Sequence, residues 1–128
     1  MIVAGIGCRK GASAAEIDAA IEAALERAGR PLARIDVMAT SAKKGDEPGI
    51  AASAAARGLR LSLVAQPDLE TASARGATWS ARVLALAGVP SVAEAAALAA
   101  CGAKAKLILP RIVVGKVTCA LAEAGDAQ

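Results

Sequence analysis

Short apolar runs alternate with amphipathic segments along the first half of the chain. The runs at 1–6, 35–40 and 59–65 have the length and apolar character of buried strands. Residues 13–28 place apolar side chains three and four positions apart, which predicts a helix. Another helix is expected at 48–57, where a proline opens the segment and a glycine follows it.

Two of the expected helices begin with a capping signal. Ser13 and Glu16 form a Ser-x-x-Glu capping box at the start of the first helix, and Ser91 and Glu94 repeat it before an apolar helix at 91–101. In such a box the serine hydroxyl and the glutamate carboxylate accept hydrogen bonds from backbone N–H groups at the helix start. Capping is therefore a sufficient explanation for these four residues.

The second half of the chain predicts one further helix and two strands. Residues 66–76 form an irregular or weakly helical connection, and residues 79–87 are expected to be helical. Strands are expected at 106–109 and 116–121, with a turn near 110–115. Because a short turn joins them, we expect these last strands to be antiparallel.

Strands that alternate with helices of this length predict an α/β fold. We expect three layers, α/β/α, around a mixed, mostly parallel sheet of about five strands. With no repeat and no interdomain linker, residues 1–124 are expected to form a single domain and 125–128 a loose tail. Ligands of open α/β sheets bind beyond the carboxyl ends of the strands, so the loops there are the candidate site.

Composition narrows the function classes. The chain has 128 residues, 55% of them hydrophobic, with one Trp and no Phe or Tyr, so a core of small side chains is expected. The most apolar region, 83–101, is interrupted by Pro90, Ser91 and Glu94, which argues against a membrane span. The first residue leads directly into an apolar strand, which argues against a secretory signal and leads us to expect a cytoplasmic location.

The chain contains no His, so the commonest general base and metal ligand is absent. Its three cysteines are widely spaced, which predicts neither a disulfide framework nor a zinc site, and we expect no metal and no cofactor. A net charge of +3, with a single aromatic residue available to stack on bases, gives little support for nucleic-acid binding.

A glycine-rich loop at 5–11 follows the first strand and precedes the first helix. Its backbone N–H groups could bind an anion, and Arg9 and Lys10 would reinforce that binding. The glycine spacing matches neither a Rossmann fingerprint nor a P-loop. The alternative is a tight turn flanked by two solvated basic side chains.

The loop after the second strand holds two cations, Lys43 and Lys44, and two carboxylates, Asp46 and Glu47. It should face the first loop, so that these lysines, Arg9, Lys10 and Arg75 would suit a polyanionic ligand. Glu47 or Asp46 is the best candidate for a general base. The alternative is that one carboxylate caps the next helix and the lysines are solvated.

Three other positions have both a chemical and a structural interpretation. Cys8 beside Arg9 and Lys10 would have a lowered thiol pKa and could act as a nucleophile, or it could be a small buried apolar residue. At Ser13 and Ser91, the exposed backbone N–H groups of the first helical turn could bind a ligand carboxylate, in addition to the capping role of these serines. Cys101, Cys119 and Trp79 are interpreted as packing residues.

Four ordered blocks resemble the CobE and CbiG C-terminal domain family. Residues 5–16, GIGCRKGASAAE, are similar to its opening motif, and residues 40–49, TSAKKGDEPG, to its T-x-x-x-K-x-D-E-P-G stretch. Residues 88–98, GVPSVAEAAAL, and the ending, LPR at 109–111 with VTCALA at 117–122, are similar to the remaining blocks. The resemblance covers nearly the whole chain, and in length the chain is similar to the stand-alone CobE form.

The resemblance implies a role in cobalamin biosynthesis, with a carboxylate-rich precorrin bound near the ring-contraction and two-carbon-loss steps. Two alternatives stay open: hydrolytic opening of a precorrin lactone, as in CbiG-like proteins, with Glu47 as the base, and non-catalytic docking to another corrin-pathway enzyme. The expected ligand-binding residues are Gly7, Cys8, Arg9, Lys10, Gly11, Ser13, Thr40, Lys43, Lys44, Asp46, Ser91 and Glu94.

Overall fold

A computed structural model describes residues 1–44, 47–73, 92–102 and 104–124. The strands are β1 (Ile2–Cys8), β2 (Val37–Ser41), β3 (Arg60–Val64), β4 (Lys106–Val114) and β5 (Val117–Glu123). The helices are α1 (Ala14–Arg27), α2 (Pro48–Arg57), α3 (Gln66–Ser73) and α5 (Val92–Cys101), with a short 3-10 helix, η1 (Ala42–Lys44), after β2. The helix expected at 79–87 and the tail expected at 125–128 lie outside the described residues.

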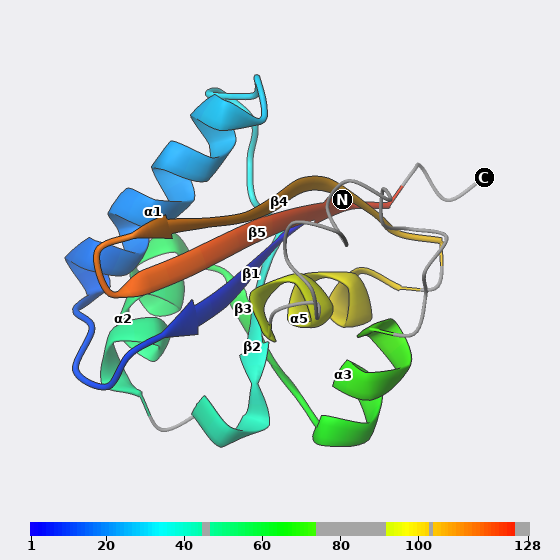
Figure 1. Cartoon of the computed structure of the whole chain (residues 1–128). Helices are drawn as coiled ribbons and strands as arrows, with labels where there is room; N and C mark the ends of the chain where they lie inside the picture. The colour runs from blue at the N-terminus through cyan, green and yellow to red at the C-terminus, as the bar shows by residue number, and fades with distance from the viewer. Residues whose placement is uncertain (45–46, 74–91, 103, 125–128) are drawn as a thin grey trace.

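The strands form one sheet in the order β3-β2-β1-β5-β4 (Figure 1). β1, β2 and β3 are parallel, whereas β5 is antiparallel to both β1 and β4. β4 therefore runs in the same direction as β1, and β5 alone is reversed. The predictions of a mixed, mostly parallel sheet and of an antiparallel last pair are both confirmed.

Helices cover both faces of this sheet, which confirms the three layers (Figure 1). Because side chains alternate along a strand, Ile6 of β1 packs with Ile17 and Ile21 of α1 on one face. On the other face Val3 of β1 packs with Leu98 of α5. α2 joins the first cluster and α3 the second.

The capping signals account for the helix ends. Ser13 is the N-cap of α1: its hydroxyl accepts from the Glu16 N–H at 3.1 Å, while the Glu16 carboxylate accepts from the Ser13 N–H at 3.0 Å. Gly58 ends α2 in the left-handed region, at φ 67°, which glycine adopts without strain. The predicted ends of these two helices are confirmed within a residue or two.

α5 lies unusually close to β1 because both contribute small residues. A Cβ atom at Gly5 would collide with the carbonyl oxygen of Ala93 and with the side chain of Ala97. The helix itself is largely alanine, and residues 95–98 are buried. This contact fixes the position of the first turn of α5 over the middle of the sheet.

Two segments differ most from the sequence prediction. The turn expected near 110–115 is wrong, because β4 continues to Val114 and the turn is confined to Gly115 and its neighbour, with Gly115 at φ 59°. A proline inside β4 is tolerated because β4 is an edge strand, so the missing N–H at Pro110 removes no bond from a second neighbour. The connection at 66–76 contains the regular helix α3.

No helix within the described ranges is both long and apolar enough to cross a membrane.

Candidate functional site

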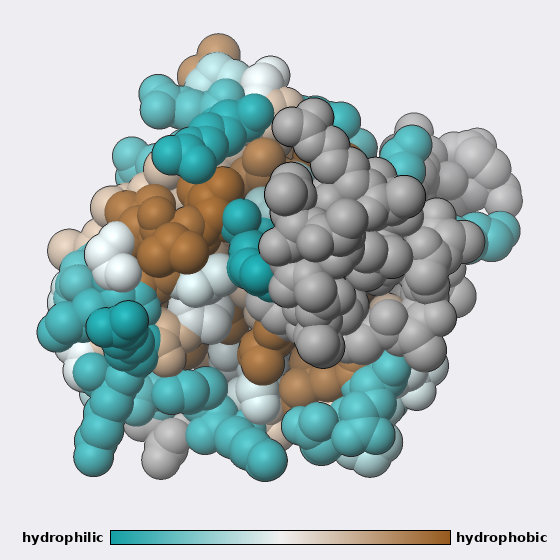
Figure 2. Space-filling view, viewed as in Figure 1, coloured by the Kyte–Doolittle hydropathy of each residue, from teal (hydrophilic) through white to brown (hydrophobic). Residues whose placement is uncertain are grey.

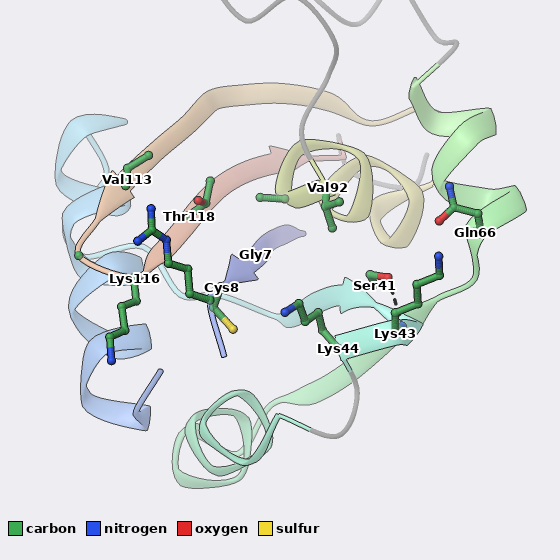
Figure 3. Close-up of a pocket in the computed structure, with 13 residues that line it drawn as sticks. Gly7, Cys8, Ser41, Lys43, Lys44, Gln66, Val92, Val113, Lys116 and Thr118 are labelled. Carbon is green, nitrogen blue, oxygen red and sulfur yellow. Dashed lines mark hydrogen bonds between the residues drawn. The ribbon is translucent and has the colours of Figure 1, made fainter. Parts of the chain in front are cut away.

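A cavity of about 590 Å³ opens at the carboxyl ends of β1 and β2 (Figure 3). This is the edge where ligands of open α/β sheets bind, and the volume is typical of small-molecule sites. The described residues that line it are Gly7, Cys8, Arg9, Ser41, Lys43, Lys44, Gln66, Val92, Ala93, Val113, Gly115, Lys116 and Thr118.

Four of these lining residues are cations, Arg9, Lys43, Lys44 and Lys116, which we call the pocket cations. They come from three separate connections: the loop after β1, η1 after β2, and the β4–β5 turn. Figure 3 shows Lys116 on one side of the pocket and Lys43 and Lys44 on the other. No carboxylate is among the lining residues that the structure describes. The pocket is therefore strongly electropositive and suits a ligand with several anionic groups.

Apolar side chains form another part of the wall. Val92 and Ala93 belong to the first turn of α5, and Val113 lies near the end of β4. Val113 is 66% exposed. Figure 2 shows a hydrophobic area over β4, bordered by hydrophilic residues. The site thus combines an apolar surface with charged groups around it.

Hydrogen bonds between the loops hold the pocket walls together. The Arg9 N–H donates to the Lys116 carbonyl oxygen at 2.9 Å, which ties the first loop to the β4–β5 turn. The Gly11 N–H donates to Oε1 of Glu47 at 3.1 Å, which ties the first loop to the start of α2. The buried Thr40 hydroxyl donates to the Ile6 carbonyl oxygen at 2.8 Å, which ties β2 to β1.

The structure brings together part of the predicted set of ligand-binding residues. Gly7, Cys8, Arg9, Lys43 and Lys44 line the pocket. Asp46 and Ser91 lie outside the described residues. Five others occupy the surrounding structure and do not line the pocket: Lys10, Gly11, Ser13, Thr40 and Glu94. The same holds for Glu47, the candidate base.

Among the residues outside the lining, Ser13 caps α1, and Glu47 accepts from a backbone N–H of the glycine-rich loop. Glu47 is also the N-cap position of α2, but its side chain makes no capping hydrogen bond. The alternative that Glu47 caps the helix through its side chain is therefore wrong. The carboxylate instead connects two loops.

Cys8 lines the pocket between the two groups of lysines (Figure 3). Burial raises the pKa of its thiol, the Glu47 carboxylate raises it further, and the Lys44 ammonium opposes them. The expectation that this loop would lower the thiol pKa is therefore wrong. Cys8 is half-buried, which agrees better with its packing role than with that of an activated nucleophile.

Glu94 is the one fully buried charged residue of the described chain. Its Oε2 accepts from the Arg111 N–H at 3.0 Å and its Oε1 from Nη1 of Arg111 at 3.4 Å. It therefore connects the first turn of α5 to the edge strand β4. The sequence interpretation of Glu94 as a capping residue or ligand contact missed this connection.

The sequence prediction also missed the contribution of the β4–β5 hairpin, which supplies Val113, Gly115, Lys116 and Thr118 to the pocket. The predicted strand order along the chain already contained a signal for this contribution. A last strand pair that is antiparallel, with one strand parallel to β1, places its turn at the carboxyl edge of the sheet, beside the glycine-rich loop. Ser41 and Gln66, which follow the predicted ends of β2 and β3 closely, were missed as well.

The described part of the chain contains no group of three or more Cys, Asp or Glu side chains that could hold a metal ion. What the fold and the pocket define is a small three-layer α/β domain with a cationic site at the carboxyl edge of its sheet, a class suited to anionic small molecules.

Comparison with known proteins identifies the family. Residues 2–122 match the family model described as cobalamin synthesis G C-terminus. Protein CobE from Sinorhizobium sp is 35% identical over 121 residues, which are 94% of this chain and 79% of that protein. The chain therefore belongs to the cobalamin synthesis G C-terminus family of cobalamin biosynthesis proteins, which confirms the resemblance seen in the sequence.

Two solved structures agree with this assignment. The cobalamin biosynthesis protein chiG from Agrobacterium tumefaciens is 48% identical, with a TM-score of 0.82 over 98% of this chain and 100% of that one. The crystal structure of CobE, a protein from the cobalamin (vitamin B12) biosynthetic pathway, is 36% identical, with a TM-score of 0.79 over 95% of this chain and 89% of that one.

Proposed function

We propose that the pocket binds a carboxylate-rich precorrin, close to the ring-contraction and two-carbon-loss steps of corrin synthesis. The observation that supports this most directly is the cluster of pocket cations on three connections around one cavity of about 590 Å³. Charge-assisted bonds from lysine and arginine to carboxylates are the strong interactions available to such a ligand. Family membership supplies the class of ligand, and the pocket supplies complementary charge.

The mixed character of the wall supports a macrocyclic ligand over a simple polyanion. A precorrin has an extended apolar ring and acetate and propionate groups around it. Val92 and Val113 offer apolar surface to the ring, while Lys116 and the two lysines of η1 lie on opposite sides and can meet carboxylates at different points of its edge. A small polyanion would use the charges but not the apolar surface.

Binding and delivery is favoured over catalysis for the described residues. Glu47, the candidate base, does not line the pocket, and its carboxylate is engaged by the Gly11 N–H. A general base must lie within hydrogen-bond reach of the proton it takes, directly or through one water. We therefore propose a carrier of the precorrin, with lactone hydrolysis as the second candidate.

A titration followed by visible absorbance tests this proposal. The protein is titrated with a cobalt-free precorrin and with a porphyrin of similar carboxylate number. Saturable binding with preference for the precorrin is expected. Arg9→Ala and Lys43→Ala are each expected to weaken affinity about three- to tenfold, the value of one partly exposed ion pair.

Matched controls are available at the other end of the sheet. Arg60 begins β3 and Lys106 begins β4, both exposed and far along their strands from the pocket. Arg60→Ala and Lys106→Ala are expected to leave affinity unchanged. Equal losses in pocket and control variants would contradict a specific site, because they would show only the effect of net charge.

The remaining outcomes separate the alternatives. A new product spectrum that is lost in Glu47→Gln would favour the lactone hydrolase. If neither tetrapyrrole binds, the carrier proposal fails, and retention of a partner enzyme that is lost in Lys10→Glu/Lys43→Glu would favour docking to a corrin-pathway enzyme.

A further inference from the structure

The edge strand β4 carries one wall of the pocket but has weak support of its own. It pairs with β5 alone, and its register shifts twice, between Leu107 and Leu109 and again between Leu109 and Ile112. The second shift inserts one extra residue, a bulge that bends the strand and interrupts its ladder. Val113, Gly115 and Lys116 of the pocket follow directly after this bulge.

Within the bulge, the backbone N–H of Arg111 is bonded to a side-chain carboxylate. Pro110 has no N–H, and the Arg111 N–H donates to the Glu94 carboxylate at 3.0 Å. The Arg111 guanidinium reaches the second oxygen of the same carboxylate at 3.4 Å. The Glu94 side chain is 1% exposed, whereas that of Arg111 is 31% exposed. A buried carboxylate from α5 thus takes up the donors of the bulged edge strand.

The other end of this connection is fixed. α5 packs on β1 so closely that a Cβ at Gly5 would collide with Ala93, the residue before Glu94. Val92 and Ala93 line the pocket themselves. Glu94 therefore joins a rigid part of the pocket wall to a part that has one strand neighbour and a break in its ladder.

We propose that Glu94 is a positioning residue of the ligand site, which holds the bulge at Arg111 and so places Lys116 and Val113 against the ligand. This inference rests on the proposed function, because it concerns how the same pocket keeps its shape. Glu94 acts through the hairpin and not by touching the ligand. Binding groups need such support to stay in a productive geometry.

A double-mutant cycle tests whether Glu94 and Lys116 act together. Affinity for the precorrin and for the porphyrin is measured in the wild type, Lys116→Ala, Glu94→Gln and the double variant. Glu94→Gln keeps the size of the side chain but cannot accept from both Arg111 donors. Lys116→Ala is expected to cost about three- to tenfold in the wild type and close to nothing in the Glu94→Gln background.

The matched control is the same cycle with Lys43→Ala, because Lys43 lies on η1, away from the hairpin. Its cost is expected to be equal in both backgrounds. The proposal is overturned if Lys116→Ala weakens affinity by the same factor in the wild type and in Glu94→Gln. It is also overturned if the effects of Lys116→Ala and Lys43→Ala both disappear in Glu94→Gln, because that would mean a general loss of structure. If Glu94→Gln does not fold, Arg111→Met enters the cycle, because it removes one contact and leaves α5 unaltered; a smaller but specific fall in the Lys116 factor is expected.

A second measurement needs no ligand. Amide hydrogen exchange at 112–118 is expected to be about tenfold faster in Glu94→Gln, with exchange in β2 unchanged. Unchanged exchange in the hairpin would overturn the positioning role. If the wild type binds no tetrapyrrole, the proposed function fails, while the exchange result still decides whether Glu94 holds the hairpin.

Discussion

Two regions of this protein use positive charge in opposite ways. Arg30 donates to both carboxylate oxygens of Glu123, and Arg57 donates to Asp18 at 2.7 Å; we call these two pairs the arginine clamps. The pocket cations, three of them lysines, have no carboxylate within 4.0 Å among the residues described. One set of charges is paired within the fold, and the other is gathered around a cavity without forming an ion pair among the described residues.

The difference shows what each type of side chain contributes. The planar guanidinium holds a carboxylate through two parallel bonds, which joins distant parts of the chain such as residues 30 and 123. Lysines on loops keep a mobile point charge, and several of them in one place repel each other. A polyanion would relieve that repulsion, so ligand binding should stabilise the pocket region more than the clamps.

The largest effect is expected when the pocket loses its lysines together. The variant Lys43→Ala/Lys44→Ala/Lys116→Ala should bind a tetrapyrrole polycarboxylate about a hundredfold more weakly, because several ion pairs are lost at once. Its thermal stability should be equal to or higher than that of the wild type, since like charges have been removed. Parallel titration and thermal unfolding check both parts, and retained affinity would contradict the proposed site.

The clamps should show the reverse behaviour. Asp18→Asn removes the charge that accepts from Arg57 and from the Ser53 hydroxyl, and should lower the free energy of unfolding by about 1–2 kcal/mol. Affinity for the ligand should not change. Urea unfolding measures the loss, with Glu22→Gln as the control, because Glu22 is 3.6 Å from Arg57 with a side chain 74% exposed and should contribute little.

Salt should separate the two regions further. Raising the ionic strength from about 0.05 to about 0.5 M shortens the screening length severalfold and should weaken ligand affinity by about five- to tenfold. Hydrogen-bonded, partly buried pairs are screened less, so the urea midpoint should move little. Affinity that does not depend on salt would show that the pocket cations do not contact the ligand's carboxylates.

The smallest effect is expected on the stability of the fold at low pH. Hydrogen bonding by Arg30 holds the pKa of Glu123 below the usual value of a glutamate, although partial burial opposes the shift. A carboxyl whose pKa is lower in the folded state adds stability above its unfolded pKa, and this is lost as the pH falls through the folded pKa. Stability should therefore decline below about pH 4.5 more steeply in the wild type than in Arg30→Met. If stability depends on pH in the same way in the wild type and in Arg30→Met, the Arg30–Glu123 pair does not contribute to stability.

Much of the fold could be predicted because its signals are local. The capping box at Ser13 and the glycine after α2 mark helix ends through hydrogen bonds within a few residues. The alternation of apolar runs and amphipathic segments determines the layers. The glycine-rich loop and the two lysines at 43 and 44 could be predicted as site residues because each follows a predicted strand, and parallel strands bring their following loops to one edge of the sheet.

What the sequence did not reveal depends on contacts distant along the chain. The reversed β5 between β1 and β4 brings Lys116 beside Arg9, more than a hundred residues apart in sequence. Glu94 occupies a capping position by pattern, yet its carboxylate serves a strand 17 residues later. The extension of β4 through Pro110 follows from its place at the sheet edge, which no local pattern records.

The reversed strand also has a practical consequence. It returns the chain to its starting point: the Ala124 N–H donates to the Met1 carbonyl oxygen at 3.0 Å, at the end of the sheet opposite to the pocket. Residues 1 and 124, which lie so close, could be joined by a short linker and the chain reopened elsewhere, for example near Leu32, which is 98% exposed. A circularly permuted protein of this kind would keep its ligand-facing loops intact, and a dye or surface tether at residue 1 would report on binding without obstructing it.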